Sequence, residues 1–323
     1  MLIAARNTSQ RTSLSHLHTR IFHRPDSYQN TSLVMDAHLK APYFAPKERL
    51  PAPLPPPGVI ASSGVVLKEH TGRRVVRFGD SYVIKYGLNV SLKEGETLLF
   101  LKETQEIPVP EVYGLYSRDD VKGGKVNYII MEYISGESLE ACWSLLESCQ
   151  KKEIASQLRT CLNMLRNIPA PGYFGCLGGQ PFEESVFWIS PHDEPDQHRQ
   201  ISGPFGSEAE LNKALVQKYL YNGGSAHKAK FYSRLLPSAL RDHAAVFTHG
   251  DLQRKNIILK KDKSLVLIDW EAAGWYPEYW EYTSATVAAA AWKDDWHEYL
   301  SEMLDEYPNE YAWFDMIIRE IWS

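Results

Sequence analysis

The chain has 323 residues, of which 44% are hydrophobic and 23% charged, and its formal net charge is −5. This length is enough for one large or two moderate domains with a substantial core. The negative charge argues against general binding of nucleic acid, and no apolar stretch is long enough to cross a bilayer as a helix. We therefore expect a globular protein that binds neither nucleic acid nor membrane.

The first fifty residues differ in composition from the rest of the chain. They contain many Arg, Ser and Thr residues, and the first acidic residue is Asp26. Such a composition is typical of a mitochondrial transit peptide, but also of a disordered extension, or of upstream sequence in front of a later start at Met35. We expect residues 1–57 to be a disordered extension that ends in a stiff Pro-rich linker.

The cysteines give a further indication of the compartment. No two of them form a CxxC pair, which is consistent with reduced thiols in the cytoplasm. They are Cys142, Cys149, Cys161 and Cys176. We expect a cytoplasmic location, with a mitochondrial one as the alternative if residues 1–35 act as a transit peptide.

Short strands and one helix are predicted after the linker. Residues 64–68, 74–78 and 81–85 are short runs with β-forming residues, separated by turn residues, which predicts an antiparallel meander. A helix over residues 92–102 ends before the prolines of residues 107–110. The apolar residues 127–131 predict a buried strand that leads into a hinge between two lobes.

Helices dominate the second part of the chain. Helical spacing of apolar residues predicts a helix over residues 151–168, and two further helices are expected over residues 208–221 and 227–240. Residues 182–206 mix Pro, Gly and charged residues, which predicts a long loop and a candidate substrate lid.

The strongest motif begins at His249. Asp251 and Asn256 have the H-x-D-x-x-x-x-N spacing that kinases use for a catalytic carboxylate and a magnesium ligand. Apolar residues 264–268 predict a buried strand that ends at Asp269, which suits a second magnesium ligand. The alternative is a β-hairpin whose carboxylates are merely solvated or cap turns.

Two departures from protein kinases point to a particular branch of the superfamily. Gly250 follows the histidine where protein kinases have Arg, and Trp270 and Glu271 replace the Phe and Gly of the DFG turn. The pattern H-G-D-x-x-x-x-N followed by I-D-W resembles the aminoglycoside phosphotransferase and choline-kinase branch. Together with the strings at residues 203–205 and 274–282, it resembles fungal proteins that carry the aminoglycoside phosphotransferase domain.

This resemblance implies an α+β, two-lobed protein-kinase-like fold. The N-lobe, residues 58–134, would hold a small antiparallel sheet, and the C-lobe, residues 135–323, would be mostly helical and contain the catalytic loop. The donor would be ATP with Mg²⁺, and the acceptor a hydroxyl group of a small molecule.

The resemblance also implies roles for individual residues. Asp251 would be the catalytic base, Asn256 and Asp269 the magnesium ligands, and Lys85 the phosphate-binding lysine. Glu94 would pair with Lys85, with Glu96 as the alternative.

Two further predictions do not come from the resemblance. The position of the hinge predicts that Met131, Glu132 and Ile134 bind the nucleotide, although Met131 could equally belong to the core. Lys255 stands where the chain departs from many aminoglycoside kinases, and it either neutralises the γ-phosphoryl group or faces solvent or the acidic C-lobe.

We therefore predict an ATP- and Mg²⁺-dependent phosphotransferase that acts on a hydroxyl of a small molecule. The segment after Asp269 is acidic and rich in aromatic residues, so it could attract a cationic acceptor, unless its aromatic residues simply pack inward. The alternative function is a pseudokinase-like regulator that binds nucleotide without turnover. A protein kinase is disfavoured, because Trp275-Tyr276-Pro277 follows Asp269 closely and leaves no room for a peptide-docking segment.

Overall fold

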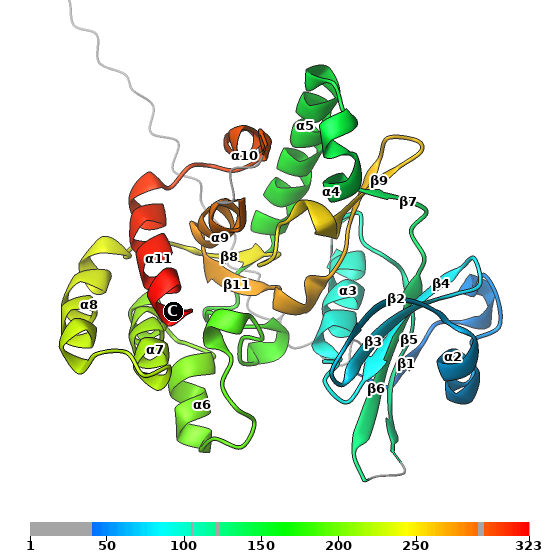
Figure 1. Cartoon of the computed structure of the whole chain (residues 1–323), viewed down its shortest axis with the longest axis horizontal. Coiled ribbons are helices and arrows are strands. Elements are labelled where there is room, and N and C mark those ends of the chain that lie inside the picture. Colours follow the sequence, from blue (N-terminus) through cyan, green and yellow to red (C-terminus); the bar gives the residue numbers. More distant parts are fainter. Residues whose placement is uncertain (1–40, 105, 121–122, 290–293, 323) are drawn as a thin grey trace, which may run out of the picture.

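Two lobes make up the part of the chain that the computed structural model describes, residues 41–104, 106–120, 123–289 and 294–322. Figure 1 shows an antiparallel sheet on one side and a mostly helical lobe on the other. The N-lobe strands are β1 (Tyr43–Phe44), β2 (Val65–His70), β3 (Arg73–Phe78), β4 (Tyr82–Gly87), β5 (Val112–Asp119) and β6 (Lys125–Glu132). They form one antiparallel sheet in the order β1-β5-β6-β4-β3-β2. The predicted meander is thus β2, β3 and β4.

The predicted disordered extension is wrong for residues 41–57. Strand β1 pairs with β5, with Tyr43 opposite Leu115, and Ala45 is buried in the N-lobe core. The backbone N–H of Ala52 donates to the Tyr82 hydroxyl over 3.3 Å. Scattered apolar side chains therefore hold this Pro-rich segment against the sheet, although its average composition is typical of a linker. The rest of the predicted extension, residues 1–40, lies outside the described residues.

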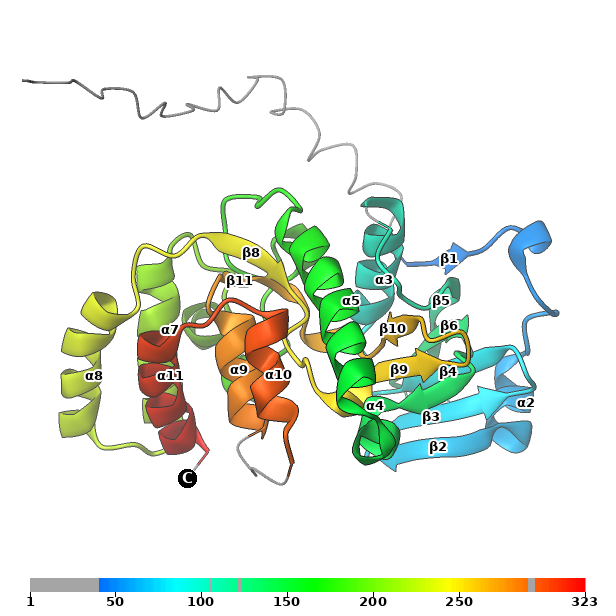
Figure 2. The ribbon, with the colours of Figure 1, turned by 90° about the horizontal axis from the view of Figure 1, so that it is seen from above.

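Two helices complete the N-lobe. Helix α2 (Pro57–Ser63) begins with a proline in its first turn, where the missing N–H has no cost. Helix α3 (Lys93–Thr104) lies beside the sheet (Figure 2) and buries Glu94 and Leu101 among other residues. The predicted helix over residues 92–102 corresponds to α3.

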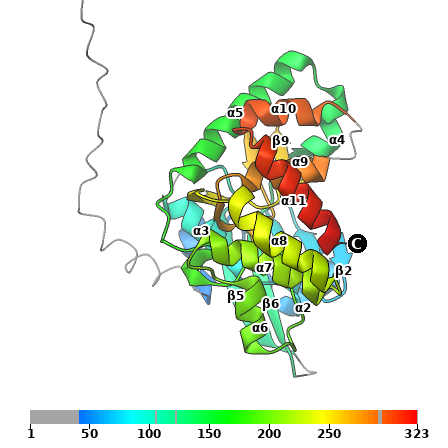
Figure 3. The same cartoon turned by 90° about the vertical axis from the view of Figure 1, so that its left-hand side faces the viewer.

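The C-lobe contains the remaining helices. They are α4 (Leu139–Cys142), α5 (Ser148–Arg166), α6 (Pro195–Ser202), α7 (Glu208–Tyr221), α8 (Ala226–Ala239), α9 (Trp280–Ala289), α10 (Trp296–Met303) and α11 (Pro308–Ile321). Figure 3 shows α7, α8 and α11 at the end of the lobe farthest from the sheet. Predicted and observed bounds of α5, α7 and α8 differ by a few residues at most.

The segment 182–206 differs from the predicted loop. It contains α6, and its side chains Phe187, Ile201 and Phe205 are at most 3% exposed. Ring stacking of Phe182 on Tyr276, with centroids 4.2 Å apart, fixes the start of the segment. These contacts anchor much of it in the C-lobe core, so it is not a freely moving lid.

Short strands position the catalytic loop between the lobes. Strand β8 (Ala245–Thr248) pairs with β11 (Gly274–Pro277), and β9 (Ile257–Lys260) lies between β10 (Leu265–Leu267) and β7 (Gly136–Ser138). The loop from residue 249 to residue 256 therefore has a paired strand at each end.

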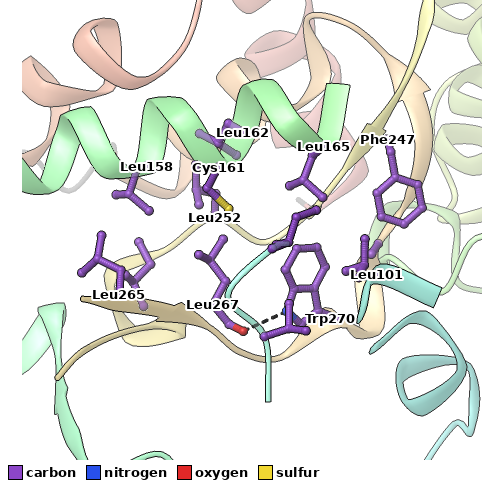
Figure 4. Packing of buried hydrophobic residues seen from close by; sticks show 14 of the residues in the cluster. Leu101, Leu158, Cys161, Leu162, Leu165, Phe247, Leu252, Leu265, Leu267 and Trp270 are labelled. Atoms are coloured by element: carbon purple, nitrogen blue, oxygen red, sulfur yellow. Dashed lines mark hydrogen bonds between the residues drawn. The ribbon is translucent and has the colours of Figure 1, made fainter. Parts of the chain in front are cut away.

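A continuous hydrophobic core joins the two lobes. It includes Leu98 and Leu101 of α3, and Leu158 and Leu162 of α5. Figure 4 shows Trp270 among these residues, next to Leu101.

None of the described helices is long and apolar enough to cross a bilayer. The aromatic residues that follow Asp269 pack inward, as the second interpretation of that segment predicted: Trp275, Tyr276, Tyr279 and Trp280 are buried.

Candidate active site

The predicted catalytic loop, residues 249–256, contains a glycine that no other residue could replace without strain. Gly250 has a φ of +83°, and a Cβ atom there would lie 2.6 Å from the carbonyl oxygen of Ala272. Positive φ and so close a backbone contact both favour glycine. This explains the G of the H-G-D string, because the loop passes directly against the turn after Asp269.

Glu281 of α9 fixes the same part of the loop. Its carboxylate accepts hydrogen bonds from the backbone N–H groups of His249 over 2.6 Å and of Gly250 over 3.2 Å. The side chain is buried, and burial raises its pKa to about 7 although both N–H groups favour the charged form. The sequence analysis noted only that the segment containing Glu281 is acidic, because its contact with the loop spans about thirty residues.

The His249 ring completes this support. Its Nδ1 accepts from the backbone N–H of Asp251 over 3.2 Å, and its Nε2 lies 3.1 Å from the carbonyl oxygen of Ile268. Burial lowers the pKa of His249, so the ring is neutral with its proton on Nε2. One histidine thus couples the loop before Asp251 to the strand before Asp269.

Replacing Glu281 with Ala is expected to destabilise the protein by about 1–3 kcal/mol, because two buried N–H groups lose their acceptor. Urea unfolding at pH 5 would measure this loss, with Glu298→Ala, on the exposed surface of α10, as control. The pKa of Glu281 is higher in the folded than in the unfolded chain. Its contribution to the free energy of unfolding is therefore complete below about pH 4.5 and is lost as the pH rises through about 7. The variant should lack this part of the pH dependence, and an unchanged profile would contradict the assignment.

Asp251 lies in a network of three neighbours. The Asn256 side-chain amide donates to its Oδ2 over 2.8 Å and to its carbonyl oxygen over 2.9 Å. The Gln253 amide donates to Oδ1, and Lys255 Nζ lies 3.3 Å from Oδ2. Lys255 therefore faces the carboxylate, whereas Arg254 forms an ion pair with Asp294 over 2.6 Å.

Asp269 has an unusual, left-handed backbone conformation. Its φ and ψ are +64° and +62°, and a single 3-10 turn, Trp270–Ala272, follows. The indole N–H of Trp270 donates to the carbonyl oxygen of Leu267 over 2.9 Å (Figure 4). The backbone N–H of Ile268 donates to the carbonyl oxygen of Asn256, also over 2.9 Å. Buried contacts on both sides thus hold Asp269 next to Asn256.

Lys85 on β4 brings three carboxylates together. Its Nζ lies 2.6 Å from Glu94, 2.9 Å from Asp269 and 3.0 Å from Glu271. Burial alone would lower the pKa of Lys85, but the three carboxylates outweigh it and raise this pKa above its usual value. Burial opposes ionisation of Asp269 as well, yet the Lys85 ammonium lowers its pKa. The partner of Lys85 on α3 is Glu94; Glu96 instead accepts from the backbone N–H of Ala41 over 3.5 Å.

The site also contains two residues that the sequence analysis did not assign. Arg73, at the start of β3, donates to both oxygens of Glu271 over 2.9 and 2.6 Å. This pair connects the β2–β3 hairpin of the N-lobe to the turn after Asp269. Glu271 was noted only as a substitute for the DFG glycine, and no local pattern marks Arg73, because 198 residues separate the two.

Replacing Arg73 with Met is expected to release the tip of the hairpin from the C-lobe. Both partners are partly exposed, so the loss of stability should be at most about 1 kcal/mol, while hydrogen exchange of the hairpin amides becomes faster. Arg74→Met is the matched control, since Arg74 pairs with Glu69 inside the same hairpin. Equal exchange rates in the two variants would contradict the proposed connection between the lobes.

The predicted hinge contains one backbone N–H that is available to a ligand. The N–H of Glu132 donates to Glu111 over 2.8 Å, and that of Tyr133 to Ser81 over 2.9 Å. The N–H of Ile134 has no partner among the described residues. Met131 is buried in the core that joins the lobes. Of the three predicted hinge residues, Ile134 therefore has the most suitable backbone for an adenine contact.

The predicted metal ligands have suitable chemistry. Mg²⁺ prefers oxygen ligands, and Asp269 provides a carboxylate. The side-chain N–H₂ of Asn256 donates to Asp251. Its Oδ1 accepts no hydrogen bond from the described residues. Carboxylate oxygens of Glu94, Asp269 and Glu271 also lie within 4.8 Å of one another. The oxygens of Asn256 and Asp269 thus suit a hard cation, whereas the group of three carboxylates already surrounds the Lys85 ammonium.

The arrangement has a counterpart among known families. Residues 58–316 match the phosphotransferase enzyme family. The chain belongs to this family. Curated relatives of this chain include subtelomeric hrmA-associated cluster proteins from two strains of Aspergillus fumigatus, 26% and 28% identical over 142 residues, or 44% of this chain. The aligned part of this chain spans only about a quarter, 26%, of the length of those proteins.

Solved structures confirm the predicted two-lobed, kinase-like fold of the chain. A thermostable mutant of the aminoglycoside phosphotransferase APH(4)-Ia has a TM-score of 0.53 and 13% identity, over 80% of this chain and 84% of that one. A ternary complex of another mutant of that enzyme with ADP and hygromycin B has a TM-score of 0.50 and 14% identity, over 80% and 93%. At this identity the similarity concerns the fold.

A cavity of about 560 Å³ lies next to the predicted catalytic loop. Asp251, Arg73 and Glu271 line it on the side of the interlobe site. Its other walls come from the segment before α6 and from α9 and α11. Such a volume is typical of small-molecule sites.

Proposed function

We propose that this phosphotransferase moves the γ-phosphoryl group of ATP, bound with Mg²⁺, to a hydroxyl of a small molecule. The observation that supports this most is the position of Asp251: it lines the cavity and is hydrogen-bonded to Asn256, whose backbone is bonded to Ile268 beside Asp269. A carboxylate with an acceptor-sized space on one side and metal-binding oxygens on the other suits phosphoryl transfer.

Each residue of the site would then have its own role in the reaction. Lys85, kept in place by Glu94, would bind the α- and β-phosphates, and Ile134 would bind the adenine. Asn256 and Asp269 would hold Mg²⁺, which neutralises phosphate charge when bound. Asp251 would accept the proton of the acceptor hydroxyl as the new O–P bond forms and the bond to ADP breaks. Lys255 would neutralise charge that develops on the transferring group.

The solved ternary complex supports this assignment of donor and acceptor. It is a complex of a protein of similar fold with ADP and a small molecule, hygromycin B. All four residues of the core set, Lys85, Asp251, Asn256 and Asp269, are present, which argues against a regulator that only binds nucleotide.

Transfer of label from γ-labelled ATP tests the proposal. The purified protein would be incubated with a pooled extract of small molecules, with Mg²⁺ or with a chelator, and labelled phosphate esters would be separated from ATP and free phosphate. We expect extract-dependent and Mg²⁺-dependent phosphate esters together with stoichiometric ADP. Nucleotide binding without any transfer would overturn the proposal and favour the pseudokinase-like regulator.

A further inference from the structure

We infer that the acceptor is an amphipathic alcohol with one apolar, ring-containing body, and not a polycationic aminosugar. The inference rests on the proposed function, because it concerns the cavity that presents a hydroxyl to Asp251. The walls of this cavity and the pairing of its charges support it independently of each other.

The wall formed by α9, α11 and the segment before α6 is largely apolar, although Ser185 and Ser284 also line it. Helix α9 contributes Trp280 and Ala285, and α11 contributes Phe314 and Ile318; all four are at most 2% exposed overall yet line the cavity. Val186 adds a further buried apolar side chain from the segment before α6. An aminosugar would leave its hydroxyl and ammonium groups without hydrogen-bond partners against such a surface, and that loss is unfavourable. An apolar ring would be favoured there.

Two tryptophans lie where the cavity meets solvent. Trp188 is 57% exposed and Trp322 58%, and they are the exposed tryptophans of the described chain; both line this cavity. The buried Lys218 donates to the carbonyl oxygen of Trp188 and lies 6.0 Å from its ring centroid. Large exposed aromatic side chains beside a cavity are typical of binding sites. Trp188 is thus held ready to contact the body of a ligand.

The charges of the cavity leave little opportunity to bind several cations. Four carboxyl groups line it, but Glu183 pairs with Lys93 over 3.0 Å and Glu271 pairs with Arg73 over 2.6 Å. Lys255 lies beside the third, Asp251. Glu184 alone has no ion pair among the described residues, and it accepts from the backbone N–H of Val186 over 2.7 Å. One free carboxyl group suits a neutral or singly charged ligand.

Binding of a graded set of probes tests the inference. The probes are 2-phenylethanol, 2-(2-naphthyl)ethanol and kanamycin, each titrated by calorimetry or saturation-transfer NMR into the full chain with Mg²⁺ and a non-hydrolysable ATP analogue. We expect the naphthyl alcohol to bind about tenfold more tightly than the phenyl alcohol, since it buries roughly 50 Å² more apolar surface. Kanamycin should not compete with it.

Variants locate the binding. Trp188→Ala and Trp322→Ala should each weaken binding of the naphthyl alcohol about 3- to 10-fold. Phe231→Ala should leave it unchanged, because Phe231 is an exposed aromatic residue of α8 that does not line the cavity. Tighter binding of kanamycin than of the naphthyl alcohol, or identical binding in all three variants, would overturn the inference.

Failure of the inference can be distinguished from failure of the proposed function. Probe binding does not require transfer, so binding that depends on Trp188 and Trp322 supports the inference even if no phosphate ester forms. Conversely, phosphorylation of kanamycin that depends on Asp251 would support the proposed function and overturn the inference.

Discussion

Replacing Asp251 with Asn is expected to lower kcat for phosphoryl transfer by about 10²–10⁴-fold, the usual range for loss of a positioned general base. The amide can still accept one hydrogen bond from Asn256 or Gln253, so the loop should keep its conformation, but it cannot take the proton of the acceptor. Because Asp251 lies outside the cluster around Lys85, affinity for the nucleotide should change little.

Steady-state ADP production and titration with a fluorescent nucleotide would measure the two effects separately. Asp242→Asn is the matched control: Asp242 is exposed and has a φ of +68°, a conformation that Asn tolerates. Equal kcat in Asp251→Asn and the control would exclude Asp251 as the base.

Replacing Lys85 with Met should cause the second largest loss of activity, about 10²–10³-fold in kcat/KM for ATP. A loss of this size is typical when one preorganised hydrogen-bond donor to a charge that develops in the transition state is removed. The side chain is buried and placed by three carboxylates, so no neighbouring cation can replace it fully. Removing the ammonium also leaves the buried Glu94 carboxylate without a partner, and breaking such a pair is destabilising by about 3–5 kcal/mol.

A thermal unfolding experiment should accompany the kinetics, because a destabilised variant could lose activity by unfolding. Combining Lys85→Met with Glu94→Gln tests the coupling: both changes together should destabilise the protein less than Lys85→Met alone, since the most deeply buried of the three carboxylates is no longer charged and unpaired. Strictly additive losses would mean that the two residues act independently.

The sequence was sufficient for features that depend on local patterns. The spacing from Asp251 to Asn256 and the apolar run before Asp269 identified the loop and both strands around it, because each signal lies within twenty residues. The choice of Glu94 over Glu96 came from the resemblance, and the Lys85–Glu94 distance agrees with it. The roles of these residues in catalysis remain predictions.

Tertiary contacts explain what the sequence did not reveal. Arg73 meets Glu271 only after both lobes have formed, and Glu281 meets His249 only after the C-lobe has folded. Arg73 and Glu281 are each ordinary charged residues in their local context. The Pro-rich segment was misinterpreted for the opposite reason: its composition is typical of a linker, while a few side chains such as Ala45 and Tyr43 are enough to pair and bury it. Phe187 and Phe205 similarly anchor a segment whose average composition is polar.

The core shared by α3, α5 and Trp270 has a consequence for motion. Because Leu101 of α3 packs in the same buried cluster as Leu158 and Leu162 of α5, a rigid-body rotation between the lobes would open a dry interior to water. Access for substrates must therefore come from smaller elements, and the β2–β3 hairpin is suited to this, since its tip is tied to the C-lobe through the solvent-accessible Arg73–Glu271 pair. Neither lobe would be a good candidate for separate expression, because each buries its part of this cluster with the help of the other.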